Sequence, residues 1–269
     1  MGPILRSLFL LMCLLISGCG YRQPVKKYTI GYDPTWFPIE VGAQDKQLLA
    51  FSIELLVEIS KKENLSLSVV ERNWDNILQG LREKQYDGAL STLRPYAFNV
   101  DRYTFSNLYL ESGPVIVTPT KSDVKNVSQV QSKEVAIIPG STATVLLQKY
   151  PGVLLRSYDS IPLALEAIVK EGVDVGVLNV LITQKYIYNL WKSKLQIASA
   201  PLTDEGIRLL TLIDEHPVFI KRFNRGLKAV KKKGIYQKLL KKWGLGPDGK
   251  EIKNIDAKLQ ALMLQLQKS

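Results

Sequence analysis

The chain has 269 residues, 46% of them hydrophobic, and a formal net charge of +11. This length is sufficient for one large domain or two small ones. It has two cysteines, both within the first 19 residues, and a single histidine. These counts exclude a disulfide framework, a cysteine-based zinc site and a histidine-rich metal site, and we expect no cofactor and no metal.

The first residues have the pattern of an export signal. The apolar run Ser7–Ile16 is ten residues long, whereas a bilayer-spanning helix needs roughly 20. Small residues follow it and end at Cys19, an arrangement that resembles the lipobox of bacterial lipoproteins. We therefore expect residues 1–18 to be a signal peptide, Cys19 to be lipidated and residues 19–27 to form a tether. An ordinary secretory signal with an incidental cysteine is the alternative.

The mature chain is expected to stay basic. Removing residues 1–18 takes away one arginine and no acid, so 35 basic and 25 acidic residues remain and the net charge is about +10. A basic surface is typical of nucleic-acid-binding proteins, but the export signal argues against that partner, and we expect none. Attraction to anionic lipid headgroups and ordinary solvated helix surface both remain as explanations of the charge.

Apolar periodicity predicts alternating strands and helices along the chain. The predicted elements are, in order, a strand at Lys27–Gly31, a helix at Leu48–Lys62, a strand at Leu65–Val70, a helix at Asn76–Lys84, a strand at 88–90, an extended segment at Phe105–Thr118, a strand at Val135–Ile138, a strand at Val153–Ser157, a helix at Pro162–Glu171 and a strand at Gly206–Ile213. Helices follow up to Gly244. The amphipathic tail at 247–269 is expected to pack on the body of the protein, with a partner contact as the alternative.

The stretch Asp87–Ser106 carries the first chemical signal. Its buried strand ends in Ser91 and Thr92, and Arg94 follows. In an open α/β sheet, ligands bind beyond the carboxyl ends of the strands, and the planar fork of an arginine matches the two oxygens of a carboxylate. The pattern therefore favours an anion-binding strand end. A strand end with turn residues and a solvated arginine is the alternative.

A second copy of this unit supports the first interpretation. The helix Asn76–Lys84 precedes residues 86–92, and the helix Pro162–Glu171 precedes residues 173–179. Each unit has an acidic residue before a short apolar strand, and each strand ends in a polar residue, which is Asn179 in the second copy. Two such units indicate two α/β lobes that each offer a strand end to a shared cleft.

Between the two units, Gly140, Ser141 and Thr142 open a helix. A helix N-terminus binds carboxylates through its unpaired N–H groups. Simple capping of the helix by Ser141 or Thr142 explains the same residues, and both roles can coexist.

In order and spacing, these pieces resemble the bacterial solute-binding proteins of the polar amino-acid ABC transporter family, which are type II periplasmic binding proteins of family 3. The resemblance covers about residues 28–245 and rests on Tyr28–Glu40, Phe51–Leu55, Trp74-Asp75, Asp87–Arg102, Gly140–Thr142 and Lys241–Gly244. It implies a two-lobed α/β fold in which each lobe is a mixed sheet flanked by helices. The division expected is lobe 1 at 28–118 and 203–246 and lobe 2 at 119–202, with crossings near 117–121 and 200–204.

The resemblance also implies a set of ligand contacts. The family's contact positions fall on Asp33, Trp36, Trp74, Ser91, Thr92 and Thr142. By this resemblance Asp33 receives a ligand amine, and Trp36 and Trp74 sandwich the side chain of the ligand. Core packing is the alternative for Trp74.

Two positions depart from the family's pattern. Its carboxylate-binding arginine falls on Asn99, so we expect Arg94 to substitute, with Arg102 as the alternative. Its ammonium-binding aspartate falls on Asn179, which accepts a hydrogen bond but cannot pair a charge. The expected ligand is therefore a modified amino acid, a small peptide or a carboxylate without the usual amine, unless Asp33, Glu40 or another acid compensates.

The function that the resemblance implies is capture of an amino acid or related small polar solute and its delivery to the permease of an ABC transporter. We expect a monomer in the periplasm or at the cell surface, held at the membrane by its lipid anchor, with no enzymatic activity. A dehydratase-like enzyme on the same scaffold, which needs a positioned acid or base, and a ligand-sensing module are the alternatives.

Overall fold

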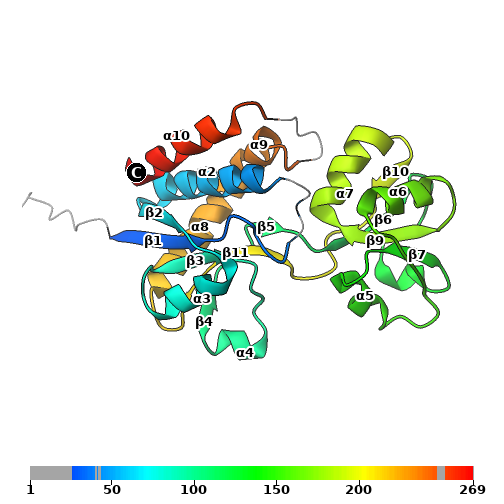
Figure 1. The fold of residues 1–269 in the computed structure, drawn as a ribbon, viewed down its shortest axis with the longest axis horizontal. Helices are drawn as coiled ribbons and strands as arrows, with labels where there is room; N and C mark the ends of the chain where they lie inside the picture. The colour runs from blue at the N-terminus through cyan, green and yellow to red at the C-terminus, as the bar shows by residue number, and fades with distance from the viewer. Residues whose placement is uncertain (1–25, 40, 42–43, 247–251, 269) are drawn as a thin grey trace, which may run out of the picture.

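The computed structural model describes residues 26–39, 41, 44–246 and 252–268. The predicted signal peptide at 1–18, Cys19, most of the tether and Glu40 lie outside the described residues. Within the described ranges, no helix is long and apolar enough to cross a membrane. The chain forms two α/β lobes that lie side by side, with lobe 1 at the left of Figure 1 and lobe 2 at the right.

Lobe 1 is built on a mixed sheet with the strand order β2-β1-β3-β11-β4, and the short strand β5 also pairs with β11. Its strands are β1 (Lys27–Tyr32), β2 (Ser66–Glu71), β3 (Gly88–Ser91), β4 (Tyr103–Phe105), β5 (Leu110–Glu111) and β11 (Gly206–Leu212). β1 runs parallel to β2 and β3, whereas β11 is antiparallel to all its neighbours. Its helices are α2 (Asp45–Glu63), α3 (Trp74–Arg82), α4 (Ala97–Val100), α8 (Pro217–Lys232), α9 (Ile235–Lys242) and α10 (Ile255–Lys268).

Lobe 2 has a five-stranded sheet with the order β10-β6-β9-β7-β8. Its strands are β6 (Pro114–Pro119), β7 (Glu134–Ile137), β8 (Leu154–Ser157), β9 (Val175–Asn179) and β10 (Leu195–Ile197). β7 is parallel to β8 and β9, and β6 is antiparallel to β9 and β10. Its helical elements are the 3₁₀ turn η1 (Val127–Val130), α5 (Thr142–Leu147), α6 (Ile161–Val169), α7 (Val180–Tyr186) and the π-helical turn η2 (Ile187–Trp191).

The largest apolar core lies in lobe 1. Phe51 of α2, Phe223 of α8 and Trp243 after α9 are all almost fully buried in it. α10 lies against α2 and β2 and adds Leu262 and Leu266 to the same core (Figure 1). Over residues 252–268, the tail therefore packs on the body of the protein, as its amphipathic pattern predicts.

The lobe boundary differs from the predicted one. The first crossing was expected near 117–121, but β6 begins at Pro114 and pairs with β9 and β10 of lobe 2. Lobe 2 therefore begins before residue 119, and the first crossing lies at Ser112 and Gly113. Pro114 fits this place, because proline is tolerated at the first residue of a strand, where its missing N–H is not needed.

Candidate functional site

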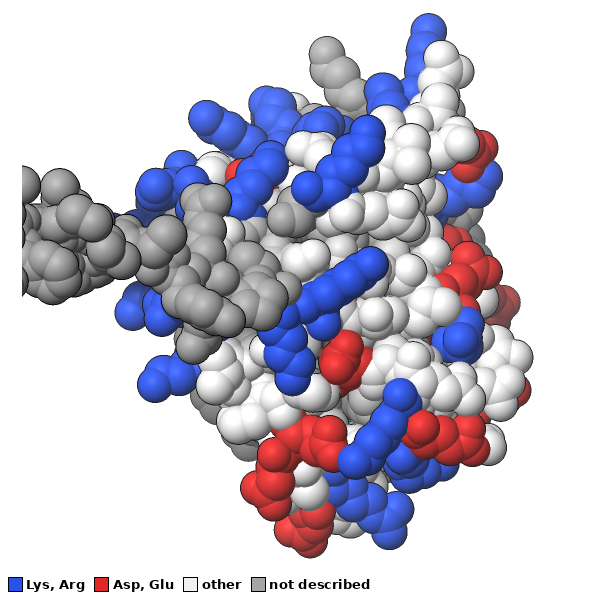
Figure 2. All heavy atoms as spheres, turned by 90° about the vertical axis from the view of Figure 1, so that its left-hand side faces the viewer, with Lys and Arg blue, Asp and Glu red and all other residues white. Residues whose placement is uncertain are grey.

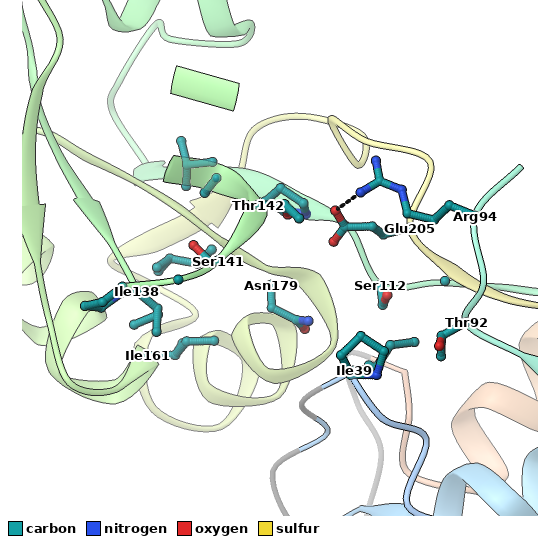
Figure 3. A pocket seen from close by; sticks show the side chains of 18 residues that line it. Ile39, Thr92, Arg94, Ser112, Ile138, Ser141, Thr142, Ile161, Asn179 and Glu205 are labelled. Carbon is teal, nitrogen blue, oxygen red and sulfur yellow. Dashed lines mark hydrogen bonds and ion pairs between the residues drawn. The ribbon is translucent and has the colours of Figure 1, made fainter. Parts of the chain in front are cut away.

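A cavity of about 350 Å³ lies between the two lobes (Figure 3). Its lobe 1 side and the crossing segments contribute Pro38, Ile39, Thr92, Arg94, Ser112, Glu205 and Gly206. Its lobe 2 side contributes Pro114, Ile138, Pro139, Gly140, Ser141, Thr142, Ala143, Ile161, Val177, Leu178 and Asn179. Of the residues proposed from the sequence, the fold thus brings together Thr92, Arg94, Thr142 and Asn179.

Thr92 and Ser91 at the end of β3 have different surroundings. Thr92 lines the cavity, and its Oγ1 donates a hydrogen bond to the carbonyl oxygen of Phe37 at 2.8 Å. Ser91 is buried and does not line the cavity, and its Oγ accepts a hydrogen bond from the N–H of Leu93 at 3.1 Å. Because successive residues of a strand face opposite sides, two adjacent hydroxyls seldom serve one site.

Arg94 forms an ion pair with Glu205, with 3.1 Å between Nη1 and Oε1. Its guanidinium carbon also lies 4.9 Å from the centre of the Tyr96 ring. Asn99 takes no part in the cavity: its Nδ2 donates to the carbonyl oxygen of Arg94 at 2.7 Å. Asn99 therefore stabilises the loop that carries Arg94. Arg102 is exposed and does not line the cavity.

On the lobe 2 side, the cavity is lined by hydroxyls and an amide. Thr142 is the first residue of α5, and Ser141 is its N-cap residue. The Oγ of Ser141 is buried and has no hydrogen-bond partner among the described residues. Asn179 caps α7, because its Oδ1 accepts hydrogen bonds from the N–H groups of Leu181 and Ile182.

The aromatic residues are arranged differently from the prediction. Trp36 is 2% exposed and belongs to the core of lobe 1, where its Nε1 donates to the carbonyl oxygen of Asp45 at 3.4 Å. Phe37 is instead the exposed aromatic of this loop, and it packs edge-on against Trp74 with ring centres 5.4 Å apart. Neither Trp36 nor Trp74 lines the cavity. In this structure the two tryptophans therefore do not form the predicted sandwich.

The carboxylate of Asp33 accepts hydrogen bonds within its own turn. Both carboxylate oxygens accept hydrogen bonds from Thr35 Oγ1, at 3.0 and 2.8 Å, and Oδ1 also accepts one from the Thr35 N–H at 3.0 Å. The residue is 4% exposed and does not line the cavity. Its local geometry explains Asp33 as a turn-forming residue, and the implied contact with a ligand amine has no support here.

Glu205 is the site residue that the sequence analysis missed. It stands directly before β11, and its side chain reaches the cavity beside Arg94 (Figure 3). The segment predicted to return from lobe 2 to lobe 1, residues 200–204, ends one residue before Glu205. An acidic residue directly after this segment was the sequence signal that could have indicated it. Among the described residues, no cluster of three or more His, Cys, Asp or Glu side chains could hold a metal ion.

Residues 28–246 match the family of bacterial extracellular solute-binding proteins, family 3. The chain therefore belongs to this family, whose members bind solutes. α10 lies beyond the matched residues.

Individual relatives agree with this class. The chain is 24% identical over 217 residues to the L-cystine-binding protein TcyA of Bacillus subtilis, with 80% of each chain covered. It is 23% identical over 241 residues to ABC transporter arginine-binding protein 1 of Escherichia coli, with 87% of this chain and 97% of the relative covered. These relatives are amino-acid-binding proteins rather than enzymes.

Solved structures share the fold. The L-cystine solute receptor of Neisseria gonorrhoeae in its unliganded open conformation has a TM-score of 0.64 at 17% identity, with 84% of this chain and 95% of that chain covered. Substrate-binding domain 2 of GlnP from Lactococcus lactis, also in an open conformation, has a TM-score of 0.60 at 18% identity, with coverage of 83% and 98%. The two-lobed binding-protein fold predicted from the sequence is thus confirmed.

Proposed function

We propose that this protein is a lipid-anchored, extracytoplasmic binding protein that captures an amino acid or related small polar solute and delivers it to the permease of an ABC transporter. The observation that carries the proposal is the cavity of about 350 Å³ between the lobes, which Arg94 and Thr142 line from opposite sides. A solute that touches both would tie the lobes together and stabilise their closed arrangement.

Arg94 is the proposed anchor for a carboxylate of the solute. It is the sole cation among the described residues that line the cavity, and its side chain is about three-quarters buried at 27% exposure. Its planar guanidinium can donate two parallel hydrogen bonds to a carboxylate. The hydroxyls of Thr92 and Thr142 are further partners for the polar end of a solute.

The proposed lipid anchor at Cys19 is consistent with the charge of the face where β1 begins. The described chain starts at Lys26, seven residues after Cys19. Around this start, Lys26, Lys27, Lys61 and Lys62 are exposed, and Arg222 donates to the carbonyl oxygen of Asn64 beside them. Figure 2 shows Lys and Arg side chains gathered over the upper part of this face. Such a face is suited to lie near anionic headgroups.

Binding of a solute is tested by a thermal-shift screen of amino acids, short peptides and small carboxylates. A ligand that binds only the folded state stabilises it by about 2.7 kcal/mol at a hundred times its dissociation constant. At least one compound should therefore raise the melting temperature clearly. Native mass spectrometry of the freshly purified protein provides an independent readout. No shift across the screen and no co-purified solute would contradict the proposal.

Lipid attachment is tested by Cys19→Ser, with Cys13→Ser as the matched control. Cys13 lies in the predicted signal peptide, so its replacement should leave palmitate labelling and membrane retention unchanged. Cys19→Ser should abolish both. Labelling that survives Cys19→Ser would contradict lipid attachment at Cys19 but would not affect the proposal of solute capture.

A further inference from the structure

Asn179 stands where the resemblance placed the partner of a ligand ammonium group, and the structure shows what it does instead. Its Oδ1 accepts hydrogen bonds from the backbone N–H of Leu181 at 2.9 Å and of Ile182 at 3.4 Å. The oxygen is thus engaged in capping α7, and the side chain carries no charge. Lobe 2 therefore offers no charged partner for an ammonium group at this position.

The cavity nevertheless contains one negative charge. Among the described lining residues, Glu205 is the sole acid and Arg94 the sole base, and they face each other as an ion pair at 3.1 Å. Their side chains are 20% and 27% exposed, so both charges are largely removed from water. The described part of the site is therefore electrically neutral.

Glu205 is held firmly at the junction of the two lobes. Its carbonyl oxygen accepts a hydrogen bond from the N–H of Ser112 at 2.9 Å, which joins the two crossing segments. Gly206 follows with φ of 151°, and a Cβ there would collide with the carbonyl oxygen of Leu110. Glycine at this position lets β11 pair with β5, and this pairing holds the backbone next to Glu205 in place.

We propose that Glu205 is the partner of a solute ammonium group, and that Arg94 and Glu205 together select solutes with one carboxylate, one ammonium group and an uncharged remainder. This inference rests on the proposed function of the cavity. A zwitterion placed between the two side chains gives each of them a new partner of opposite charge. A solute with a charge of one sign leaves the other buried side chain without compensation, which is costly.

The opposite wall fits an uncharged remainder. Ile138, Ala143 and Ile161 give it an apolar surface, and Ser141 adds a buried hydroxyl without a hydrogen-bond partner among the described residues. Figure 3 shows this wall across the cavity from Arg94 and Glu205. A third charge on the solute would find no partner among the described lining residues. A hydroxyl, thioether, amide or hydrocarbon group would be accommodated.

Titration calorimetry of the purified full-length protein tests the charge rule. The probes are the common L-amino acids, each in its free form and as its Nα-acetyl derivative, which lacks the α-ammonium group. The best amino acid with an uncharged side chain should bind at least tenfold more tightly than arginine, lysine, aspartate or glutamate, and at least tenfold more tightly than its own N-acetyl derivative. Equal or tighter binding of a charged amino acid overturns the rule of an uncharged remainder.

Glu205→Gln tests the assigned residue, because it keeps the shape and the backbone pairing of Glu205. It should weaken binding of the best amino acid at least tenfold while leaving binding of the N-acetyl derivative unchanged or tighter. Glu40→Gln is the control, since the sequence names Glu40 as an acid that could compensate for the missing charge at Asn179. A single cooperative melting transition shows that each variant is folded.

The outcomes separate the assignment from the proposed function. If Glu40→Gln loses the amino acid and Glu205→Gln keeps it, the assignment to Glu205 is wrong although the protein still binds amino acids. If neither free nor acetylated amino acids bind the wild-type protein, the charge rule and the assignment fail, whereas the proposed function fails only if the short peptides and small carboxylates of the thermal-shift screen also do not bind.

Discussion

The two lobes present different chemistry to the cleft. The lobe 1 side carries both charges of the described lining, Arg94 and Glu205, whereas lobe 2 contributes hydroxyls, an amide and apolar side chains. Charge-assisted hydrogen bonds are about twice as strong as neutral ones. If the cavity binds a solute as proposed, lobe 1 would hold its charged end, and lobe 2 would add weaker, neutral contacts when the lobes close.

The hydrophobic cores of the two lobes also differ in size. Lobe 1 has one large core that continues through α2, α8, α9 and α10, and a smaller core under α3 on the other face of its sheet. Lobe 2 has two smaller cores on opposite faces of its sheet, as the alternation of Val115 and Ile116 along β6 shows. At its edge, β8 leaves Leu154 and Leu155 exposed. Fewer buried apolar contacts make a region easier to open locally, so lobe 1 is the more rigid platform.

The largest expected effect is on the core that α10 completes. Leu266 is fully buried there, so Leu266→Ala should destabilise the protein by about 2–5 kcal/mol through lost burial and a cavity. Leu264→Ala on the same helix is the control, because Leu264 is 52% exposed and its truncation should cost less than about 0.5 kcal/mol. Urea denaturation followed by circular dichroism measures both. An equal loss of unfolding free energy in the two variants would show that α10 does not contribute to the core of lobe 1.

The charged side of the cleft is tested by Arg94→Ala. The variant should weaken solute binding at least tenfold, which is about 1.4 kcal/mol or more. Arg102→Ala is the control, because Arg102 is exposed and outside the cavity. Titration calorimetry on both variants decides between them. Loss of binding in Arg102→Ala alone would show that the wrong arginine has been assigned.

The neutral side of the cleft should matter less. Thr142→Val keeps the shape of the side chain and removes its hydroxyl, so affinity should fall by roughly two- to tenfold, the effect of one neutral hydrogen bond. Thr144→Val is the matched control on α5: its Oγ1 is buried, has no hydrogen-bond partner among the described residues and does not line the cavity. If Thr142→Val lowers the affinity as much as Arg94→Ala does, the proposed difference between a charged and a neutral side of the cleft is wrong.

The architecture could be predicted because its signals are local. Each strand is a short apolar run and each helix has a regular apolar face, so the sequence predicts the order of elements in both lobes. The strand ends then point to the cleft, and Thr92, Arg94 and Asn179 do line it. Glu205 was missed because its place depends on β11 pairing with β5, a contact between segments far apart in the chain.

Side-chain direction within the first loop could not be predicted. Trp36 has a left-handed backbone with φ of 57°, which is uncommon for a bulky residue and has no local sequence signal. The structure buries Trp36 in the core and leaves its neighbour Phe37 exposed. A contact assigned by motif matching is therefore sensitive to a shift of one residue, whereas the position of the loop itself is not.

The last expected effect appears only at alkaline pH and again falls in lobe 1. Burial, and then the neighbouring Glu71 carboxylate, raise the pKa of Tyr32 from 10.0 to about 12. Burial also raises the pKa values of Tyr109 and Tyr236 above the ordinary range. The folded state thus keeps these phenols protonated at pH values where the unfolded chain loses the protons. Their contribution to stability is complete below about pH 10 and is lost as the pH rises through the folded-state pKa.

Tyr32→Phe isolates this contribution, since it removes the titrating group and keeps the ring on β1. The free energy of unfolding of the wild type should fall more steeply between pH 10 and about 12 than that of Tyr32→Phe. Tyr96→Phe is the control, because Tyr96 is 45% exposed, and its curve should follow the wild type. Urea denaturation at neutral and alkaline pH gives the three slopes. Superimposable slopes for the wild type and Tyr32→Phe would show that the phenol of Tyr32 ionises as readily in the folded protein as in the unfolded chain, and that the packing of β1 protects it less than the structure indicates.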